Sequence, residues 1–234
     1  MIKIFESEVV SVEKANDSVR ILKLSVPKDF GFKPGQYVSL SVFIGGKKFR
    51  KPFSIAFPSA KKGEIELCVK LVENSKTSEF VSKLKKGDKV ELFGPAGKFL
   101  IGEHSMKKDL VFISVGTGIT PFVSMIPSLL EGKFKNKIIL LKGFRYDENI
   151  LYDQLFNKLK IKCKNFEFHN ILSRPNNSKF GDKGHVQDFL EKYLPKDFKG
   201  DAYICGLSPM IIAVKKKLIS MEVPEKNIFY EKYD

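Results

Sequence analysis

The chain has 234 residues, of which 43% are hydrophobic, and its formal charge of +14 comes mostly from lysines spread along its length. No apolar run approaches the length of a membrane span, and the first ten residues lack the apolar core of a signal peptide. We therefore expect a cytoplasmic protein without membrane insertion. The three cysteines lie far apart without C-x-x-C spacing and the three histidines are also separated, so we expect no disulfide framework and no metal site. Any redox chemistry then needs a bound organic cofactor.

The first hundred residues contain short runs in which apolar and polar side chains alternate, a pattern typical of strands with one buried face. The runs are 5–12, 19–26, 36–43, 64–71 and 89–93, and turn residues separate them. This spacing predicts an antiparallel β-barrel of five or six strands. One amphipathic helix is expected over residues 76–84, with Thr77 or Ser78 as its N-cap.

From residue 109 the pattern changes to strands that alternate with amphipathic helices. Strands are expected at 110–115, 137–142, 166–172, 201–205 and 227–230, and helices are expected to begin at Pro121, Asn149, His185 and Pro209. Such alternation predicts a doubly wound parallel sheet covered on both faces. The polar segment 103–109 separates the two patterns, so the expected domains are residues 1–104 and 105–234.

Two strands of the second half end at glycine turns. Gly116-Thr117-Gly118 is followed by Thr120-Pro121, which predicts an N-cap and the first helical residue, and Cys205-Gly206 is followed in the same way by Ser208-Pro209. A helix N-terminus reached over glycines suits a phosphate or pyrophosphate group, although such a turn can also be purely structural. Because ligands of doubly wound sheets bind beyond the carboxyl ends of the strands, both turns are expected to line one crevice.

Motifs in sequence order resemble the ferredoxin–NADP reductase family over nearly the whole chain. They are PGQY from Pro34, RKPFSIA from Arg50, TSEFVSKLKKGD from Thr77, GPAGKF from Gly94, GTGITP from Gly116, GFRYDENILY from Gly143, the pair Ser173-Arg174, CGLSPM from Cys205 and YEKYD from Tyr230. The resemblance implies an N-terminal antiparallel six-stranded FAD-binding barrel with one helix. It also implies a C-terminal doubly wound parallel sheet that binds NADP.

The resemblance implies flavin contacts in the first half. Phe53 would lie beside the isoalloxazine ring, and the Ser54 hydroxyl would lie near flavin N5. Arg50, Lys51 and Pro52 precede them, and either cation can pair with the FAD diphosphate, so that choice stays open. The helix N-terminus at Thr77 and Ser78 would hold the same diphosphate.

In the second half the resemblance implies nucleotide contacts. The path of the nucleotide would include Gly116, Thr117, Gly118, Thr120 and Pro121. Cys205 and Gly206 would lie at the hydride-transfer site, where we do not expect Cys205 to act as a nucleophile. Arg145, Ser173 and Arg174 follow strands at their carboxyl ends and would surround the 2′-phosphate of NADP. Glu231 and Tyr233 fit the spacing of a C-terminal aromatic that covers the flavin.

The resemblance therefore implies an FAD-dependent NADPH oxidoreductase that passes electrons between NADPH and a separate carrier such as ferredoxin or flavodoxin. A monomer is favoured. The alternatives are an NAD(P)H:flavin reductase of the same fold and an electron-transfer subunit of a larger complex. Nucleic acid is not an expected partner, because the chain has no clustered basic stripe and no nucleic-acid motif.

Overall fold

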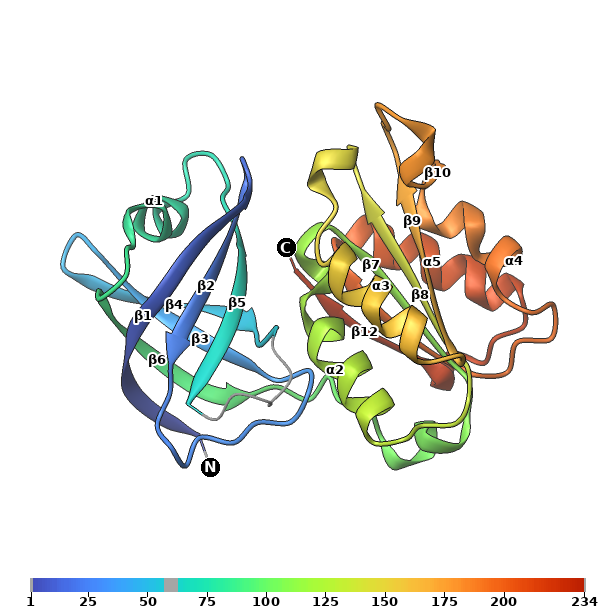
Figure 1. Cartoon of the computed structure of the whole chain (residues 1–234), viewed down its shortest axis with the longest axis horizontal. Helices are drawn as coiled ribbons and strands as arrows, with labels where there is room; N and C mark the ends of the chain where they lie inside the picture. The colour runs from blue at the N-terminus through green and yellow to red at the C-terminus, as the bar shows by residue number, and fades with distance from the viewer. Residues whose placement is uncertain (1, 57–62, 234) are drawn as a thin grey trace. The chain divides into compact units, whose positions relative to one another are not determined.

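The computed structural model describes residues 2–56 and 63–233. The chain divides into two compact units (Figure 1). One contains Met1–Leu100 and Thr120–Met125, and the other contains Ile101–Ile119 and Ile126–Asp234. The functional division at residues 104 and 105 stays a prediction. No helix within the described ranges has both the length and the apolar character needed to cross a bilayer.

The first unit is a six-stranded antiparallel sheet in the order β4-β3-β6-β1-β2-β5, which confirms the fold expected for this half. Its strands are β1 (Lys3–Asn16), β2 (Val19–Ser25), β3 (Tyr37–Ile44), β4 (Lys47–Ser54), β5 (Glu64–Lys70) and β6 (Lys89–Ala96). Alternation of apolar and polar residues does not predict β4, whose sequence KKFRKPFS is basic and contains proline. Such a sequence is tolerated here because β4 is an edge strand.

The barrel is open along one seam. The two edge strands, β4 and β5, meet in the described part of the chain at one isolated bridge, between Ile55 and Leu67. The core inside the sheet is aliphatic and includes Leu22, Leu40 and Leu92, all without exposed surface. Side chains of β4 that point toward this core are therefore covered incompletely, a property that matters for the site.

Helix α1 (Lys76–Lys83) packs against β3 and occupies the region expected for a helix. Its N-cap differs from the prediction. Ser75 caps the helix, and its hydroxyl accepts a hydrogen bond from the Ser78 N–H at 3.3 Å. The Ser78 hydroxyl instead accepts the N–H of Val72 at 2.8 Å, which joins the helix to the preceding turn.

The second unit is a parallel six-stranded sheet in the order β10-β9-β8-β7-β11-β12. The strands are β7 (Leu110–Val115), β8 (Ile138–Phe144), β9 (Phe166–Leu172), β10 (Asp182–Lys183), β11 (Asp201–Gly206) and β12 (Ile228–Lys232). The helices are α2 (Thr120–Glu131), α3 (Asp153–Lys162), α4 (Leu190–Tyr193) and α5 (Ser208–Ser220). In Figure 1, α3 and α5 lie on opposite faces of the sheet, as expected for a doubly wound fold.

Four helix starts differ from the sequence predictions. Helix α5 begins at Ser208 with Leu207 as its N-cap, so Ser208 is the first helical residue and not the cap expected before Pro209. Thr120 is the first residue of α2 and not its N-cap, because a 3₁₀ turn over Gly116–Ile119 joins the strand to the helix. Helix α3 begins at Asp153, since Tyr152 has a positive φ of 57° and interrupts the helix expected from Asn149. The segment after His185 begins as a 3₁₀ turn, Val186–Phe189.

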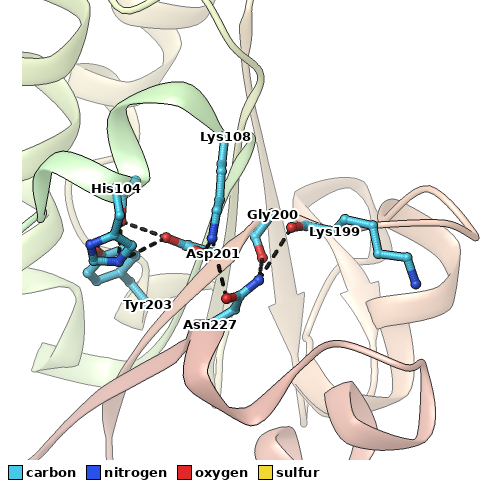
Figure 2. Close-up of polar contacts among 8 residues, drawn as sticks. His104, Lys108, Lys199, Gly200, Asp201, Tyr203 and Asn227 are labelled. Carbon is cyan, nitrogen blue, oxygen red and sulfur yellow. Dashed lines mark hydrogen bonds and ion pairs between the residues drawn. The ribbon is translucent and has the colours of Figure 1, made fainter.

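A buried carboxylate fixes the start of β11. Asp201 has no exposed surface, and it accepts a hydrogen bond from the Ser105 hydroxyl at 2.6 Å and pairs with Lys108 at 2.8 Å. Figure 2 shows His104 and Asn227 at the same cluster. A buried charge is tolerated only when it is paired and hydrogen-bonded, so these contacts set the position of the strand whose other end carries Cys205.

Candidate functional site

In the first unit, the candidate site is the edge strand β4, where the register with β3 decides which way each side chain points. Phe53 pairs with Val38 and Lys51 pairs with Leu40, and both partners are fully buried in the core. Residues directly opposite in an antiparallel pair share a face. Lys51 and Phe53 therefore lie on the core-facing side of β4, at the open seam.

Arg50 lies on the opposite side of β4. It pairs with Ser41, its guanidinium lies 4.8 Å from the centre of the Phe93 ring, and one of its nitrogens is 3.9 Å from the Glu91 carboxylate. Its charge is thus already engaged by an aromatic face and an acid. Of the two cations left open by the sequence, only Lys51 shares a face with Phe53.

Ser54 ends β4 and is only 3% exposed, opposite Tyr37 in the register. Pro52 and Thr77 lie near the surface, whereas the buried Ser78 hydroxyl is used in the turn before α1. The free N–H groups at the start of α1 remain a place for an anion. The residues that the sequence predicted to contact a flavin thus lie in two elements of the first unit, β4 and α1.

In the second unit, a separate candidate site is a pair of glycine turns that pack directly on each other. A Cβ on Gly118 would lie 2.4 Å from the Cys205 carbonyl oxygen and 3.0 Å from the Gly206 Cα, so only glycine fits there. Gly116 has a φ of +55°, and a Cβ there would meet nothing within 4 Å. The close contact at Gly118 holds the two turns together, whereas Gly116 leaves open space over the backbone.

Cys205 lies at the carboxyl end of β11 with no exposed surface. Burial, with a smaller contribution from Glu231, raises the pKa of its thiol well above the ordinary value, while a hydrogen bond with Tyr233 opposes that shift. Glu231 pairs with Cys205 across the parallel strands, and the Tyr233 N–H donates to the Gly206 carbonyl at 3.0 Å. The structure thus gathers the strand-end cysteine, its glycine, the acid and the aromatic side chain.

A further candidate site in the second unit joins two exposed arginines. Backbone hydrogen bonds continue beyond β8 and β9: the Ser173 N–H donates to Phe144 O at 3.0 Å, and the Arg174 N–H donates to Arg145 O at 2.8 Å. Both arginines are exposed. The pairing brings Arg145, Ser173 and Arg174 to one sheet end, as expected for neighbouring parallel strands.

Acidic residues lie in the same loop. Asp147 accepts a hydrogen bond from the backbone N–H of Asn177 at 2.9 Å, and Glu148 accepts one from the Asn176 side chain at 3.2 Å. The other Asp147 carboxylate oxygen, Oδ1, is buried and has no hydrogen-bond partner among the described residues. The acids therefore connect the loops after β8 and β9, and one buried oxygen of Asp147 is left without a partner among the described residues.

Sequence reasoning missed Lys142, a fully buried lysine in the middle of β8. Its ammonium lies 2.9 Å from the Asp153 carboxylate and donates to the Leu151 carbonyl at 3.1 Å. Burial lowers the pKa of Lys142 to about 8, although Asp153 opposes that shift. These contacts hold the segment that begins at Arg145. One charged residue inside the apolar run IILLKGF was the signal in the sequence.

Ser105, His104 and Asp201 have the residue types of a hydrolytic triad but not its arrangement. The Ser105 hydroxyl lies 3.1 Å from His104 Nε2, but it has no exposed surface and donates its proton to Asp201 at 2.6 Å, while His104 contacts the same carboxylate at 3.2 Å. A nucleophilic serine must instead be accessible and give its proton to the histidine. This cluster is structural.

Comparison with protein families gives two matches in chain order. Residues 6–101 match the oxidoreductase FAD-binding domain, and residues 112–216 match the oxidoreductase NAD-binding domain. The chain is 33% identical to the reductase component DmpP of phenol 2-monooxygenase from Pseudomonas sp. strain CF600 over 98% of its own length, and it spans 65% of the length of that protein. It is 29% identical to ferredoxin–NADP reductase B of Sorangium cellulosum over 98% of both chains.

A solved structure agrees with these matches at the level of the fold. A ferredoxin NADP⁺ reductase from Neisseria gonorrhoeae, with bound FAD and NADP, superposes with a TM-score of 0.87 and 19% identity. The alignment covers 98% of both chains.

Proposed function

Because this chain belongs to the ferredoxin–NADP reductase family, as an oxidoreductase with an FAD-binding and an NAD(P)-binding domain, we propose that it oxidises NADPH and passes the electrons to a separate one-electron carrier. Ferredoxin or flavodoxin is the first choice of carrier. The observation that carries this proposal is the direct packing of Gly118 on Cys205 and Gly206 at the ends of neighbouring strands. This junction suits a nucleotide that must present its nicotinamide at a fixed place.

The first unit fits FAD. When bound, FAD accepts a hydride and releases single electrons, which no side chain of this protein can do. Phe53 supplies a flat face at the open seam, and Lys51 on the same face supplies a charge for the diphosphate. Ser54 supplies a hydroxyl that can both donate to and accept from a flavin nitrogen. The start of α1 supplies the backbone N–H of Thr77 for the diphosphate, and the Ser78 N–H joins it when it leaves the Ser75 hydroxyl.

The second unit fits a nicotinamide nucleotide. Gly116, Thr117 and Gly118 supply a backbone path without bulky side chains, and Thr120 and Pro121 open the helix that follows. The raised pKa keeps the Cys205 thiol neutral, so it excludes water and packs against the ring without acting as a nucleophile. We assign Tyr233, with Glu231, the role of covering the flavin until nicotinamide replaces it.

We propose NADPH as the preferred nucleotide. Arg145 and Arg174 are exposed and joined by a backbone hydrogen bond, and Ser173 lies beside them. Two guanidinium groups suit the 2′-phosphate, which NADH lacks. Asp147 is the counter-argument, because its unpartnered oxygen could accept from a ribose hydroxyl if the loop moved to expose it. A preference for NADH would indicate that Asp147, not the arginines, reads the ribose.

The test is anaerobic stopped-flow reduction of the purified protein. The protein should retain FAD through gel filtration, be reduced faster by NADPH than by NADH, and then reduce ferredoxin or flavodoxin. A colourless protein that reduces added riboflavin would show a flavin reductase instead.

A second candidate electron acceptor is the oxygenase of a multicomponent system, because the chain is 33% identical to the reductase component of a monooxygenase. In that case the chain is the electron-transfer part of an oxygenase system. NADPH would reduce the protein and an artificial dye, and free ferredoxin and flavodoxin would not be turned over.

A further inference from the structure

We propose that Phe49 stacks on the adenine ring of FAD, so that one strand, β4, contacts the flavin, the diphosphate and the adenine. This inference rests on the proposed FAD cofactor. Phe49, Lys51 and Phe53 occupy alternate positions of one edge strand and provide an aromatic ring, a positive charge and a second aromatic ring. FAD has matching parts in the same order, which are the adenine, the diphosphate and the isoalloxazine.

The register places the three side chains on one face. Their partners on β3 are Val42, Leu40 and Val38, and all three partners are fully buried in the core. Because directly opposite residues share a face of the sheet, Phe49, Lys51 and Phe53 all point toward the core side of β4. Phe49 is nevertheless 46% exposed.

The open seam explains this exposure. A phenylalanine on the core side of a strand is normally covered by the next strand of a closed barrel. Here β4 is an edge, and in the described part of the chain its connection to β5 is the bridge from Ile55 to Leu67, far along the strand from Phe49. A flat apolar ring is thus presented at the seam, where a planar ligand can cover it.

The spacing agrees with an extended dinucleotide. Each strand residue advances about 3.3 Å, so the two steps from Phe53 to Lys51 and from Lys51 to Phe49 are about 7 Å each. A ligand with the isoalloxazine at Phe53 and the diphosphate at Lys51 brings its adenine to Phe49 when it lies along the strand. FMN lacks the adenine, so in the same orientation it would reach Lys51 but not Phe49.

The test measures flavin binding and not turnover. Apoprotein is titrated with FAD and with FMN, by calorimetry and by quenching of flavin fluorescence, for the wild type and for Phe49→Ala, Phe49→Tyr and Phe43→Ala. Phe43 is the matched control, because it is 63% exposed in the same hairpin but pairs with Lys48 on the other face. Circular dichroism confirms that each variant folds.

We expect Phe49→Ala to weaken FAD on the order of tenfold to a hundredfold, the usual effect of removing one aromatic that stacks on a base, and to leave FMN unchanged. Phe49→Tyr should restore FAD binding, and Phe43→Ala should change neither flavin. Equal affinities of the wild type for FAD and FMN, or parallel losses of both in Phe49→Ala, would overturn the assignment. A wild type that binds neither flavin would instead overturn the proposed function.

Discussion

The Lys142 ammonium lies 2.9 Å from the Asp153 carboxylate, although the lysine side chain has no exposed surface at all. Around it stand the rings of Phe144, Phe156 and Phe168, whose centres are 5.9, 5.2 and 4.9 Å from its nitrogen. The effect of burial outweighs that of the Asp153 carboxylate and lowers the pKa of Lys142 from 10.5 to about 8. The pair joins β8 to the start of α3 and holds the loop between them.

This pKa shift predicts how stability depends on pH. Between about pH 8 and 10.5 the folded state binds fewer protons at Lys142 than the unfolded state, so the free energy of unfolding contributed by Lys142 rises with pH in that window. The full difference is about 3 kcal/mol. Urea denaturation at several pH values should show this rise in the wild type but not in Lys142→Met. The exposed-lysine control Lys135→Met should keep the wild-type slope, and parallel slopes in all three proteins would contradict the prediction.

The cysteines should differ in reactivity. Burial raises the pKa of the Cys205 thiol, and the thiolate is the form that reacts, whereas Cys163 is partly exposed. With limiting iodoacetamide at pH 8, mass spectrometry should find Cys163 modified roughly ten times faster than Cys205. Rapid modification of Cys205 in the folded protein would show an accessible thiolate.

Ser54→Ala should slow hydride transfer and leave FAD bound. Loss of one positioned hydrogen bond costs about 1 to 3 kcal/mol in the transition state, or roughly ten- to a hundredfold in rate. Anaerobic stopped-flow gives the rate of flavin reduction, and the flavin-to-protein ratio after gel filtration gives retention. Since the diphosphate contacts are elsewhere, retention should stay at the wild-type level. An unchanged reduction rate would remove Ser54 from the site.

Arg174→Ala should raise the KM for NADPH by roughly ten- to a hundredfold and leave NADH almost unchanged, because a guanidinium forms two charge-assisted bonds with a phosphate and none with a ribose hydroxyl. Steady-state kinetics with a dye acceptor measures both values. The neighbouring variant Lys179→Ala serves as a control for general loss of positive charge. Equal losses with both nucleotides would place Arg174 outside the 2′-phosphate site.

The charge of +14 should steer an acidic carrier. The Debye length falls from about 30 Å at 0.01 M salt to about 10 Å at 0.1 M, so the association rate with ferredoxin or flavodoxin should fall steeply over that range. Reduction by NADPH should respond less. A carrier-reduction rate that is flat across the range would mean that the lysines do not guide the encounter.

Periodicity in the sequence predicted every strand except β4 and the two-residue β10, because one-sided burial and strand–helix alternation leave strong local signals. It did not predict the cap of α1, because Ser75, Thr77 and Ser78 are all capable of capping and only the path of the chain selects Ser75. Nor did it predict where α3 begins, because Tyr152 adopts a left-handed conformation that its residue type does not signal.

The sequence named candidate residues for the site but did not predict how they are arranged. Gly118 and Cys205 are 87 residues apart in the chain, and they meet because β7 and β11 are neighbours in the sheet. The difference between Arg50 and Lys51 depends on the register of β4 with β3, which a strand without alternating apolar residues does not specify. Lys142 acquires its partners only when α3 packs on β9.

The open edge of β4 has a consequence for the protein before it acquires a cofactor. An unpaired strand edge is a template on which an identical strand from another molecule can add, and this is a common route to aggregation. Here Lys47, Lys48, Arg50 and Lys51 lie along that edge. Like charges would face each other in such a pairing. The same basic residues that made β4 hard to recognise as a strand should therefore also keep newly made chains from associating through this edge.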